Sequence, residues 1–427
     1  MRTIEVATCK RETTSEKAIL LKRPVLVLGW IPRIVVSVAR SLRDHGVPVD
    51  VADFTGEARP HSRSIRYFKR LPWPDSDSSR FLAQIRDFIQ QHGHDLVIPA
   101  DDQALLALVQ HYDDLNNLAH IACPPPPVTA LVLNKLSTLE VARKCGLEIP
   151  KTKLISNSAE LFESLSSFPL PWVLKPSSKQ VRAEEVKSYT FRAVEDVKAA
   201  FPTTKDFTPP MLLQQYCSGF GVGVEVLMHK GKSVAVFQHR RLEEFPYSGG
   251  MSVTAMAEQP DPALIEKSVA LLCALKWEGP AMVEFKVDGR NGEAFLMEVN
   301  GRYWGTISLP ISVGVDFPLY HWQSVHGETP VVPDRYAVGT RWLWTTGYLM
   351  RLHGLLVAAR RSRPARHEFQ QSLMQFPAWL NRSTGHALFC ASDPMPSVLE
   401  LLRALKFLFV SDAKALFKRV APRGRFR

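Results

Sequence analysis

The sequence contains no run of about 18 uncharged apolar residues, which is the length that a membrane-spanning helix requires. No signal peptide is evident either, because residues 1–23 mix Arg, Lys and Glu around a short apolar patch. The six cysteines are scattered and form no C-x-x-C pair, and none of the 13 histidines has a metal-ligand spacing. We therefore expect a cytoplasmic protein with reduced thiols, without a disulfide framework or a zinc site. The cysteines are Cys9, Cys123, Cys145, Cys217, Cys273 and Cys390.

Acidic residues are scarce near the C-terminus. Residues 331–427 contain 16 Lys and Arg but only 5 Asp and Glu, so this segment carries the whole net charge of +11. The densest basic runs are 360–366 and 414–427, the second interleaved with Leu and Phe. Such asymmetry indicates an anionic partner, which could be nucleic acid, a membrane surface or an acidic substrate.

The periodicity of the remaining chain predicts an α/β protein. Residues 24–53 read as a buried strand, a helix and a second strand, and the unit repeats up to residue 109. This alternation favours a Rossmann-like domain over residues 24–122, preceded by an extension over 1–23. Four prolines at 124–127 predict a stiff connector that neither a helix nor a central strand can continue.

A second unit is expected over residues 128–330. Residues 128–210 alternate short strands and helices and form its first lobe, whereas 211–330 are mostly strand and form its second lobe. Residues 331–427 read as a basic, mainly helical C-terminal segment. The predicted fold class is therefore α/β and α+β.

The main chemical signal is a predicted hairpin over residues 283–302. Two strands flank a Gly/Asn turn, and strand alternation places Glu284, Glu298 and Asn300 on one face. Two opposed carboxylates repel each other unless a cation lies between them, and Mg²⁺ accepts carboxylate and amide oxygens beside phosphates. Arg302 follows as a donor to phosphate. The alternative interpretation is a solvated hairpin face with unrelated charges.

This motif, Glu284 with Glu298-Val299-Asn300-Gly301-Arg302, resembles the metal-binding strand pair of the ATP-grasp superfamily. That superfamily includes carbamoyl phosphate synthase large subunits, biotin carboxylases and D-alanine–D-alanine ligases, and residues 303–318 resemble a carboxylate–amine-ligase-like branch. The resemblance covers residues 24–320 and implies a Rossmann-like domain followed by a two-lobed ATP-grasp domain. The usual Asn-Pro-Arg of the family is Asn-Gly-Arg here.

The resemblance also implies a nucleotide site. Lys135 and Lys175 match the two phosphate-binding lysines, although the loop after Lys175, over 177–182, contains no glycine, and Lys179 or Arg182 could contact phosphate instead. The hinge that pairs with adenine corresponds to Gln214, Gln215, Tyr216 and Cys217, and Glu225 is a candidate for the ribose. Arg240 or Arg241 would face the γ-phosphate and the carboxylate substrate, beside Arg302 as catalytic residues.

The implied function is ATP-dependent joining of a carboxylate to an amine through an acyl phosphate, with Mg²⁺, or alternatively Mn²⁺, as the cofactor. Carbamoyl phosphate or carboxylation chemistry is a close alternative, and a nucleotide-binding protein without turnover is a more distant one. The basic C-terminal segment could be a module for nucleic acid or membrane, or could receive an acidic substrate. The oligomeric state is open, with a homodimer as one option.

Overall fold

The computed structural model describes residues 22–56, 61–179, 188–247, 249–360, 362–379, 381 and 384–406. Residues 1–21 of the N-terminal extension, which include Cys9, therefore lie outside the described residues, as do Arg182 and the basic run 414–427. None of the described helices is long and apolar enough to cross a membrane. The five cysteines of the described part are free thiols.

The N-terminal unit is built around a five-stranded sheet with the order β3-β2-β1-β4-β5, and all of its strand pairs are parallel. The central strands are fully buried apolar segments, as a parallel sheet covered on both faces requires. This confirms the predicted α/β domain. Its elements are β1 (Val25–Leu28), α1 (Pro32–Asp44), β2 (Val49–Asp53), β3 (Phe68–Arg70), α2 (Ser78–His92), β4 (Leu96–Pro99), α3 (Asp102–Gln110), α4 (Tyr112–Asn116) and β5 (His120–Ile121).

The proline run after β5 differs in part from the prediction of a pure connector. Helix α5 (Pro126–Leu133) begins inside the run, and Pro126 and Pro127 occupy its first turn. Proline is tolerated there because the first N–H groups of a helix have no intrahelical acceptor. Helix α6 (Lys135–Lys144) follows directly, with the Asn134 side chain capping its first turn.

A small antiparallel sheet of four strands comes next, in the order β6-β9-β7-β8. It has its own hydrophobic core, which includes Trp172, Phe191 and Leu213. The elements are β6 (Thr152–Asn157), α7 (Ser158–Ser164), the 3-10 helix η1 (Leu165–Ser167), β7 (Trp172–Pro176), β8 (Tyr189–Phe191), α8 (Val194–Ala200) and β9 (Asp206–Gln215).

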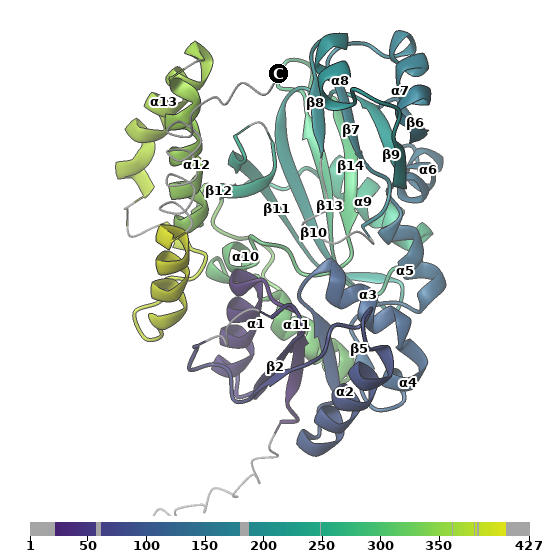
Figure 1. The fold of residues 1–427 in the computed structure, drawn as a ribbon. Coiled ribbons are helices and arrows are strands. Elements are labelled where there is room, and N and C mark those ends of the chain that lie inside the picture. Colours follow the sequence, from purple (N-terminus) through teal and green to yellow (C-terminus); the bar gives the residue numbers. More distant parts are fainter. Residues whose placement is uncertain are drawn as a thin grey trace, which may run out of the picture.

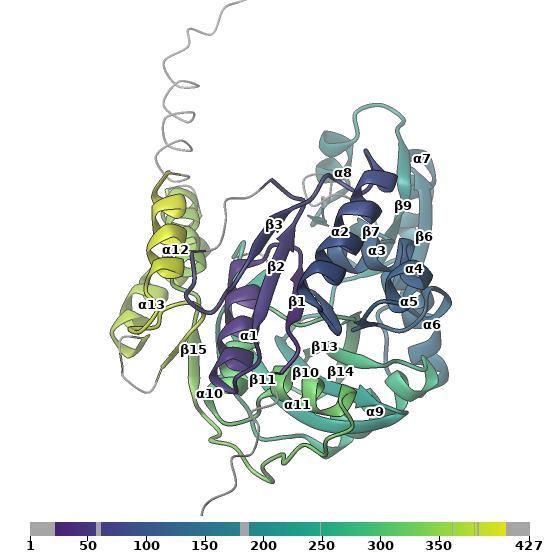
Figure 2. The same ribbon diagram turned by 90° about the horizontal axis from the view of Figure 1, so that it is seen from below.

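The largest sheet has seven strands in the order β14-β13-β10-β11-β12-β15-β16. In Figure 1 the N-terminal unit lies below the large sheet and the small sheet lies at the upper right. Figure 2 shows the same units from below, with the N-terminal unit in front. One core cluster joins the N-terminal unit to the large sheet, since Val27 of β1 shares it with Phe237 of β11. The strands are β10 (Phe220–His229), β11 (Lys232–Phe245), β12 (Met251–Ala257), β13 (Gly279–Val287), β14 (Ala294–Asn300), β15 (Arg341–Leu343) and β16 (Gly385–His386).

The segment after residue 330 is more than a helical extension, because it supplies β15 and β16 to the large sheet. It is also tied to the N-terminal unit, since the Asp393 carboxylate accepts bonds from Arg40 Nε at 3.1 Å and Ser62 Oγ at 2.6 Å. Pairing partners this distant along the chain cannot be read from local periodicity. The remaining helices are α9 (Pro262–Ala274), α10 (Ser308–Ser312), α11 (Phe317–Val325), α12 (Thr345–Ala359) and α13 (Arg363–Trp379).

Candidate nucleotide and metal site

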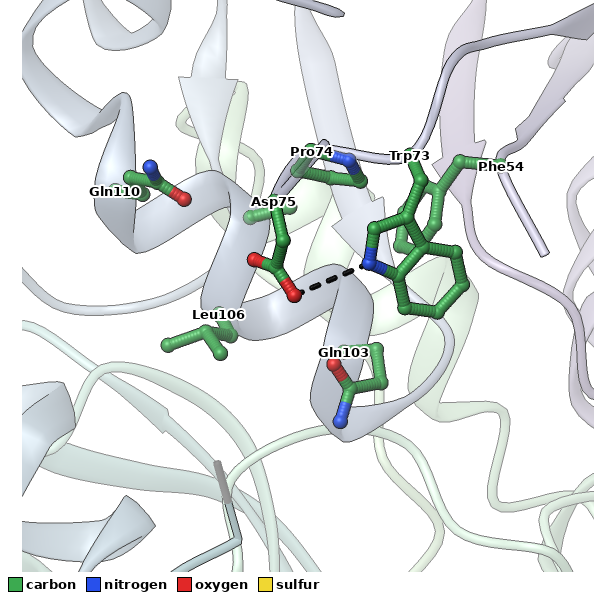
Figure 3. A pocket seen from close by; sticks show the side chains of 8 residues that line it. Phe54, Trp73, Pro74, Asp75, Gln103, Leu106 and Gln110 are labelled. Carbon is green, nitrogen blue, oxygen red and sulfur yellow. Dashed lines mark hydrogen bonds between the residues drawn. The ribbon is translucent and has the colours of Figure 1, made fainter. Parts of the chain in front are cut away.

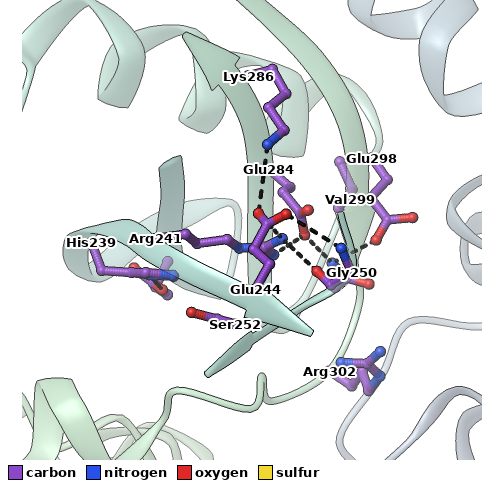
Figure 4. A network of polar contacts seen from close by, with 12 residues as sticks. His239, Arg241, Glu244, Gly250, Ser252, Glu284, Lys286, Glu298, Val299 and Arg302 are labelled. Atoms are coloured by element: carbon purple, nitrogen blue, oxygen red, sulfur yellow. Dashed lines mark hydrogen bonds and ion pairs between the residues drawn. The ribbon is translucent and has the colours of Figure 1, made fainter. Parts of the chain in front are cut away.

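The hairpin of β13 and β14 forms as the sequence predicts, and Glu284 lies directly opposite Glu298. The two carboxylates do not touch, because the Asn300 amide lies between them. Asn300 Nδ2 donates to Glu284 Oε2 at 3.3 Å and to Glu298 Oε1 at 3.2 Å (Figure 4). The three predicted metal-site residues therefore form one cluster at the end of β14.

Lys179 joins this cluster from the loop after β7. Its ammonium donates to the Asn300 Oδ1 and Val299 carbonyl oxygens, both at 2.8 Å, and lies 3.8 Å from Glu298 Oε2. Only 7% of the Lys179 side chain is exposed. A lysine with such contacts is not a surface residue, so Lys179 connects the end of β7 to the hairpin of β13 and β14.

Lys135 and Lys175 approach the same hairpin from the small-sheet side. Lys135 begins α6, and its backbone N–H donates to the carbonyl of Ser177, the residue directly after β7. Burial lowers the pKa of both lysines, that of Lys175 to about 8. Lys135 lowers the Lys175 pKa further by charge repulsion, and Glu298 opposes the shift of both lysines. Neither ammonium has a carboxylate within 4.0 Å in the described part of the chain.

Glu298 is the carboxylate on which these cations converge. Burial alone would raise its pKa, but Lys179, Lys135 and Lys175 together hold that pKa well below its usual range. Glu298 is therefore ionised at neutral pH. Three ammonium groups around one carboxylate leave positive charge uncompensated, which favours binding of a polyanion.

Arg241 extends the cluster along β11. Its Nη2 lies 2.5 Å from Glu284 Oε2, and its Nη1 lies 3.7 Å from Glu244 Oε1. Lys286 Nζ in turn lies 3.5 Å from the same Glu244 oxygen (Figure 4). Gly221 on β10 makes room for this arginine, because a β-carbon there would lie 2.8 Å from Arg241 Cδ.

Arg240 does not belong to the cluster. Successive strand residues point to opposite faces, so Arg240 stacks on the Phe220 ring at 3.5 Å and lies 3.9 Å from Glu258. Of the two arginines that the sequence left open, only Arg241 is brought to the hairpin carboxylates.

Arg302 reaches across to the N-terminal unit. Its Nε and Nη2 donate to both oxygens of Asp102, at 3.1 and 2.9 Å, in a bidentate pair. Asp102 begins α3 at the carboxyl end of β4. In an open parallel sheet, ligands bind outside the carboxyl ends of the strands where the strand order reverses, which here is between β1 and β4.

The predicted adenine hinge lies at the end of β9. Gln214 is buried and donates from Nε2 to Thr152 Oγ1 at 2.8 Å, so it supports the hinge from inside. Gln215 pairs with Trp172 of β7, and Tyr216 is 40% exposed. Burial raises the pKa of the Cys217 thiol to about 11, and the charge of Lys175 is the largest effect that opposes this shift. The predicted hinge and Lys175 thus interact electrostatically.

Glu225 is not available to a ribose. It is fully buried in the large sheet, and one carboxylate oxygen is hydrogen-bonded to His239 Nδ1. Strand alternation places Glu225 on the same sheet face as Arg241, but its carboxylate is covered there and bonded to His239, so the suggested ribose contact is corrected. Its signal in the sequence, an acidic residue after Gly-x-Gly, does not distinguish a buried position from an open one.

Arg33 is a residue that the sequence reasoning did not identify. It lies at the start of α1, directly after β1, and only 9% of it is exposed. Its guanidinium stacks on the Trp344 ring at 4.2 Å and packs so closely on Gly305 that a β-carbon there would lie 2.5 Å from Nε. Nε has no hydrogen-bond partner. Burial lowers the Arg33 pKa to about 10, the Glu400 carboxylate opposes this shift, and Arg302 adds to it.

Arg33 and Arg302 lie close enough for their positive charges to repel each other. Both guanidinium groups lie at the β1/β4 crevice, but only Arg302 has a carboxylate partner within 4.0 Å among the described residues. A buried cation without such a partner is costly unless an anion completes the site. We therefore add Arg33 to the candidate site as a receptor for an anionic group.

A separate hollow lies on the other side of α3 (Figure 3). It is lined by Phe54, Trp73, Pro74, Asp75, Gln103, Leu106, Ala107 and Gln110. None of the predicted site residues lines it, so we assign it no role in the chemistry.

The donor set at the hairpin fits Mg²⁺ bound together with phosphate. The described residues contain no group of three or more His, Cys, Asp or Glu side chains that could hold a metal ion without further ligands. Glu284, Glu298 and the Asn300 oxygen supply three hard oxygen donors, and Mg²⁺ commonly takes one or two carboxylates and completes its shell with phosphates and water. The site therefore suits a metal that arrives with a nucleotide.

Comparisons with known proteins agree with this geometry. Residues 207–346 match the family described as ATP-grasp in the biosynthetic pathway with Ter operon. A search of curated proteins found no match.

Solved structures with this fold include three enzymes of low sequence identity. An L-amino acid ligase from Bacillus licheniformis has a TM-score of 0.58 and 16% identity, over 71% of this chain and 74% of the ligase. A biotin carboxylase complex with β,γ-ATP from Campylobacter jejuni has a TM-score of 0.59 and 12% identity, over 75% of each chain.

The third is the biotin carboxylase domain of 2-oxoglutarate carboxylase from Hydrogenobacter thermophilus, a complex with MgADP, ADP and bicarbonate. Its TM-score is 0.57 at 16% identity, over 74% of this chain and 73% of the other. Such identities show a common fold and leave the reaction open. Residues 207–346 of this chain thus match an ATP-grasp family, and the chain shares the fold of these ATP-grasp structures.

Proposed function

We propose that this protein is an ATP-dependent ligase that activates a carboxylate as an acyl phosphate and transfers the acyl group to an amine. The observation that carries the proposal is the convergence of Lys135, Lys175 and Lys179 on the Glu284/Glu298 pair. The oxygens of a triphosphate need cations, and the metal ion that accompanies it needs carboxylates. A bound nucleotide therefore explains both the lysines and the carboxylates of the cluster.

Each group has a role that follows from its position. Lys135 and Lys175 bind phosphate oxygens, and the hinge over 214–217 receives adenine. Glu284, Glu298 and Asn300 hold Mg²⁺, which when bound neutralises phosphate charge. Arg241, beside Glu284, stabilises the charge on the phosphoryl group during its transfer.

The acid substrate is placed at the β1/β4 crevice. Arg33 and Arg302 orient its carboxylate, and one carboxylate oxygen attacks the γ-phosphorus while the bond to ADP breaks. The amine then attacks the acyl carbon, phosphate leaves with the former carboxylate oxygen, and the amine proton passes to water. The chain contributes position and charge and forms no covalent bond.

The direct test is an ADP-release assay with Mg²⁺ and ATP against pairs drawn from amino acids and small carboxylates. We expect release that requires both an acid and an amine, and that Glu298→Gln abolishes. Glu293→Gln is the matched control, because Glu293 is exposed at the turn of the same hairpin. Release that needs bicarbonate and no amine would favour carboxylation, and nucleotide binding without any release would contradict the proposed ligase.

A further inference from the structure

Residues 395–406 form a helix on the outside of the molecule (the yellow end of the ribbon in Figure 1), beside α12 and α13 in both views. Its inner face packs on the N-terminal unit and on the loop before α12. Trp344 Nε1 donates to Glu400 Oε1 at 3.0 Å, and Arg403 lies 6.0 Å from the Trp30 ring. Pro396 and Leu399 line the same contact with Trp30. The polar residues Glu400 and Arg403 therefore face inwards.

The outer face of this helix is apolar. Its five large apolar residues recur at helical spacing, so they form one stripe, and each of them is between 38% and 56% exposed. This stripe consists of Met395, Val398, Leu401, Leu402 and Leu405. A surface helix normally has the opposite arrangement, with its apolar stripe towards the core and its charges towards water. Single exposed apolar residues are ordinary, whereas five along one helix face mark an interaction surface.

The sequence that follows this stripe is strongly basic. Residues 407–427 contain six Lys and Arg and one Asp, together with Phe407, Leu408 and Phe409 at their start. These residues lie outside the described part of the chain, so only their composition enters the argument. An apolar helix face followed by clustered positive charge is the combination that binds anionic lipid surfaces.

We propose that the apolar stripe of residues 395–405 docks this protein on a membrane surface, and that the basic composition of the sequence after it favours anionic lipid. Nucleic acid fits less well, because the exposed helix face offers apolar side chains where phosphates need cations and bases need aromatic rings. A second copy of the chain also fits less well, because pairing two such surfaces brings two basic segments together. The inner face of the helix contacts Trp344, and the Trp344 ring stacks on Arg33 of the candidate site. The docking helix and the candidate site therefore contact the same tryptophan.

The test is sedimentation of the full-length protein with vesicles of phosphatidylcholine, alone or mixed in equal parts with phosphatidylglycerol. We expect binding to the mixed vesicles that weakens with added salt, because salt screens exposed charges. Leu402→Gln should reduce the affinity for these vesicles roughly tenfold, from the loss of one buried leucine. Leu170→Gln is the matched control, since Leu170 is 54% exposed and Leu402 is 56% exposed. Equal melting temperatures for the two variants would show that folding is not the cause.

Three results would overturn the proposal. The first is failure of the wild-type protein to sediment with the phosphatidylglycerol vesicles, and the second is equal binding by the wild type and Leu402→Gln. The third is a shift from dimer to monomer in Leu402→Gln, or binding to a duplex DNA fragment, without any vesicle binding. ATP turnover is measured separately, so failure here leaves the ligase proposal intact.

Discussion

Lys179 follows β7 of the small sheet, yet its ammonium lies 3.8 Å from the Glu298 carboxylate at the end of β14. Lys153 and Glu160 are separated by the same 3.8 Å, but the Lys153 side chain is 49% exposed, compared with 7% for Lys179. The interaction that is shielded from water is the stronger of the two, because solvent and salt screen the exposed pair.

We therefore expect Lys179→Met to raise the Kd for a magnesium–ATP analogue roughly tenfold, whereas Lys153→Met changes it little. The reason is that Lys179 orients Asn300 and Glu298 and adds a positive charge beside the phosphates. Isothermal titration calorimetry measures both constants. An unchanged Kd for Lys179→Met would limit that lysine to a structural contact between the two sheets.

Lys175 predicts a pH dependence of nucleotide binding. Burial, then repulsion from Lys135, lowers the Lys175 pKa to about 8, so the ammonium is charged at neutral pH and loses its charge above that value. We expect the affinity for the ATP analogue to fall as the pH rises through about 8 in the wild type. Lys175→Met should bind weakly at every pH, and the exposed Lys198→Met should behave like the wild type.

The same lysine should affect stability in the opposite sense. Its pKa is 10.5 in an unfolded chain, so between about pH 8 and 10.5 the unfolded state binds more protons and stability increases with pH. Lys175→Met lacks the cost of burying a charge, and should be more stable at neutral pH by roughly 1–3 kcal/mol. Urea unfolding at several pH values measures this difference, and a loss of stability in the variant would contradict it.

Arg33 is expected to control substrate binding. Arg33→Met should raise the KM of the carboxylate substrate at least roughly tenfold and leave the KM of ATP unchanged, because the loss concerns one charge-assisted contact. The variant should melt no lower than the wild type, since a buried cation without a carboxylate partner is removed. Arg240→Met, on the opposite sheet face, is the control. A lower melting temperature with unchanged KM would make Arg33 a packing residue.

Glu225 provides a test of the correction to the nucleotide site. Glu225→Gln should destabilise the protein by roughly 1–3 kcal/mol, because it weakens a buried hydrogen bond to His239. Its Kd for the ATP analogue should not change, since the carboxylate is fully buried and bonded to His239. Calorimetry and thermal melting together decide the matter. Weaker nucleotide binding without loss of stability would restore the proposed ribose contact.

Much of the fold followed from local patterns. The parallel α/β unit was readable because β1 and β4 are short buried apolar runs separated by amphipathic helices. The hairpin register was readable because a short turn and strand alternation leave Glu284 opposite Glu298. By contrast, β15 and β16 were not predicted, because strands of three and two residues depend on distant partners for their backbone hydrogen bonds.

The candidate site was likewise predicted only in part from the sequence. The hairpin carboxylates were predicted from residue type and strand alternation, whereas Lys135 and Lys175 were predicted as phosphate contacts from the family resemblance. The sequence could not distinguish Arg241 from Arg240, show that Glu225 is buried, or reveal Arg33 as a neighbour of Arg302. It offered Lys179 as a phosphate contact but not its bonds to Asn300 and Val299.

By itself, then, the sequence determined the order of the structural units, the alternating faces of each strand and the chemical groups that are available. Only the tertiary structure decided which of these groups share a site. Proximity between Lys179 and Glu298, or between Arg33 and Arg302, arises where separate sheets and helices pack together. Charge interactions then depend on that distance and burial, neither of which is encoded in any one segment.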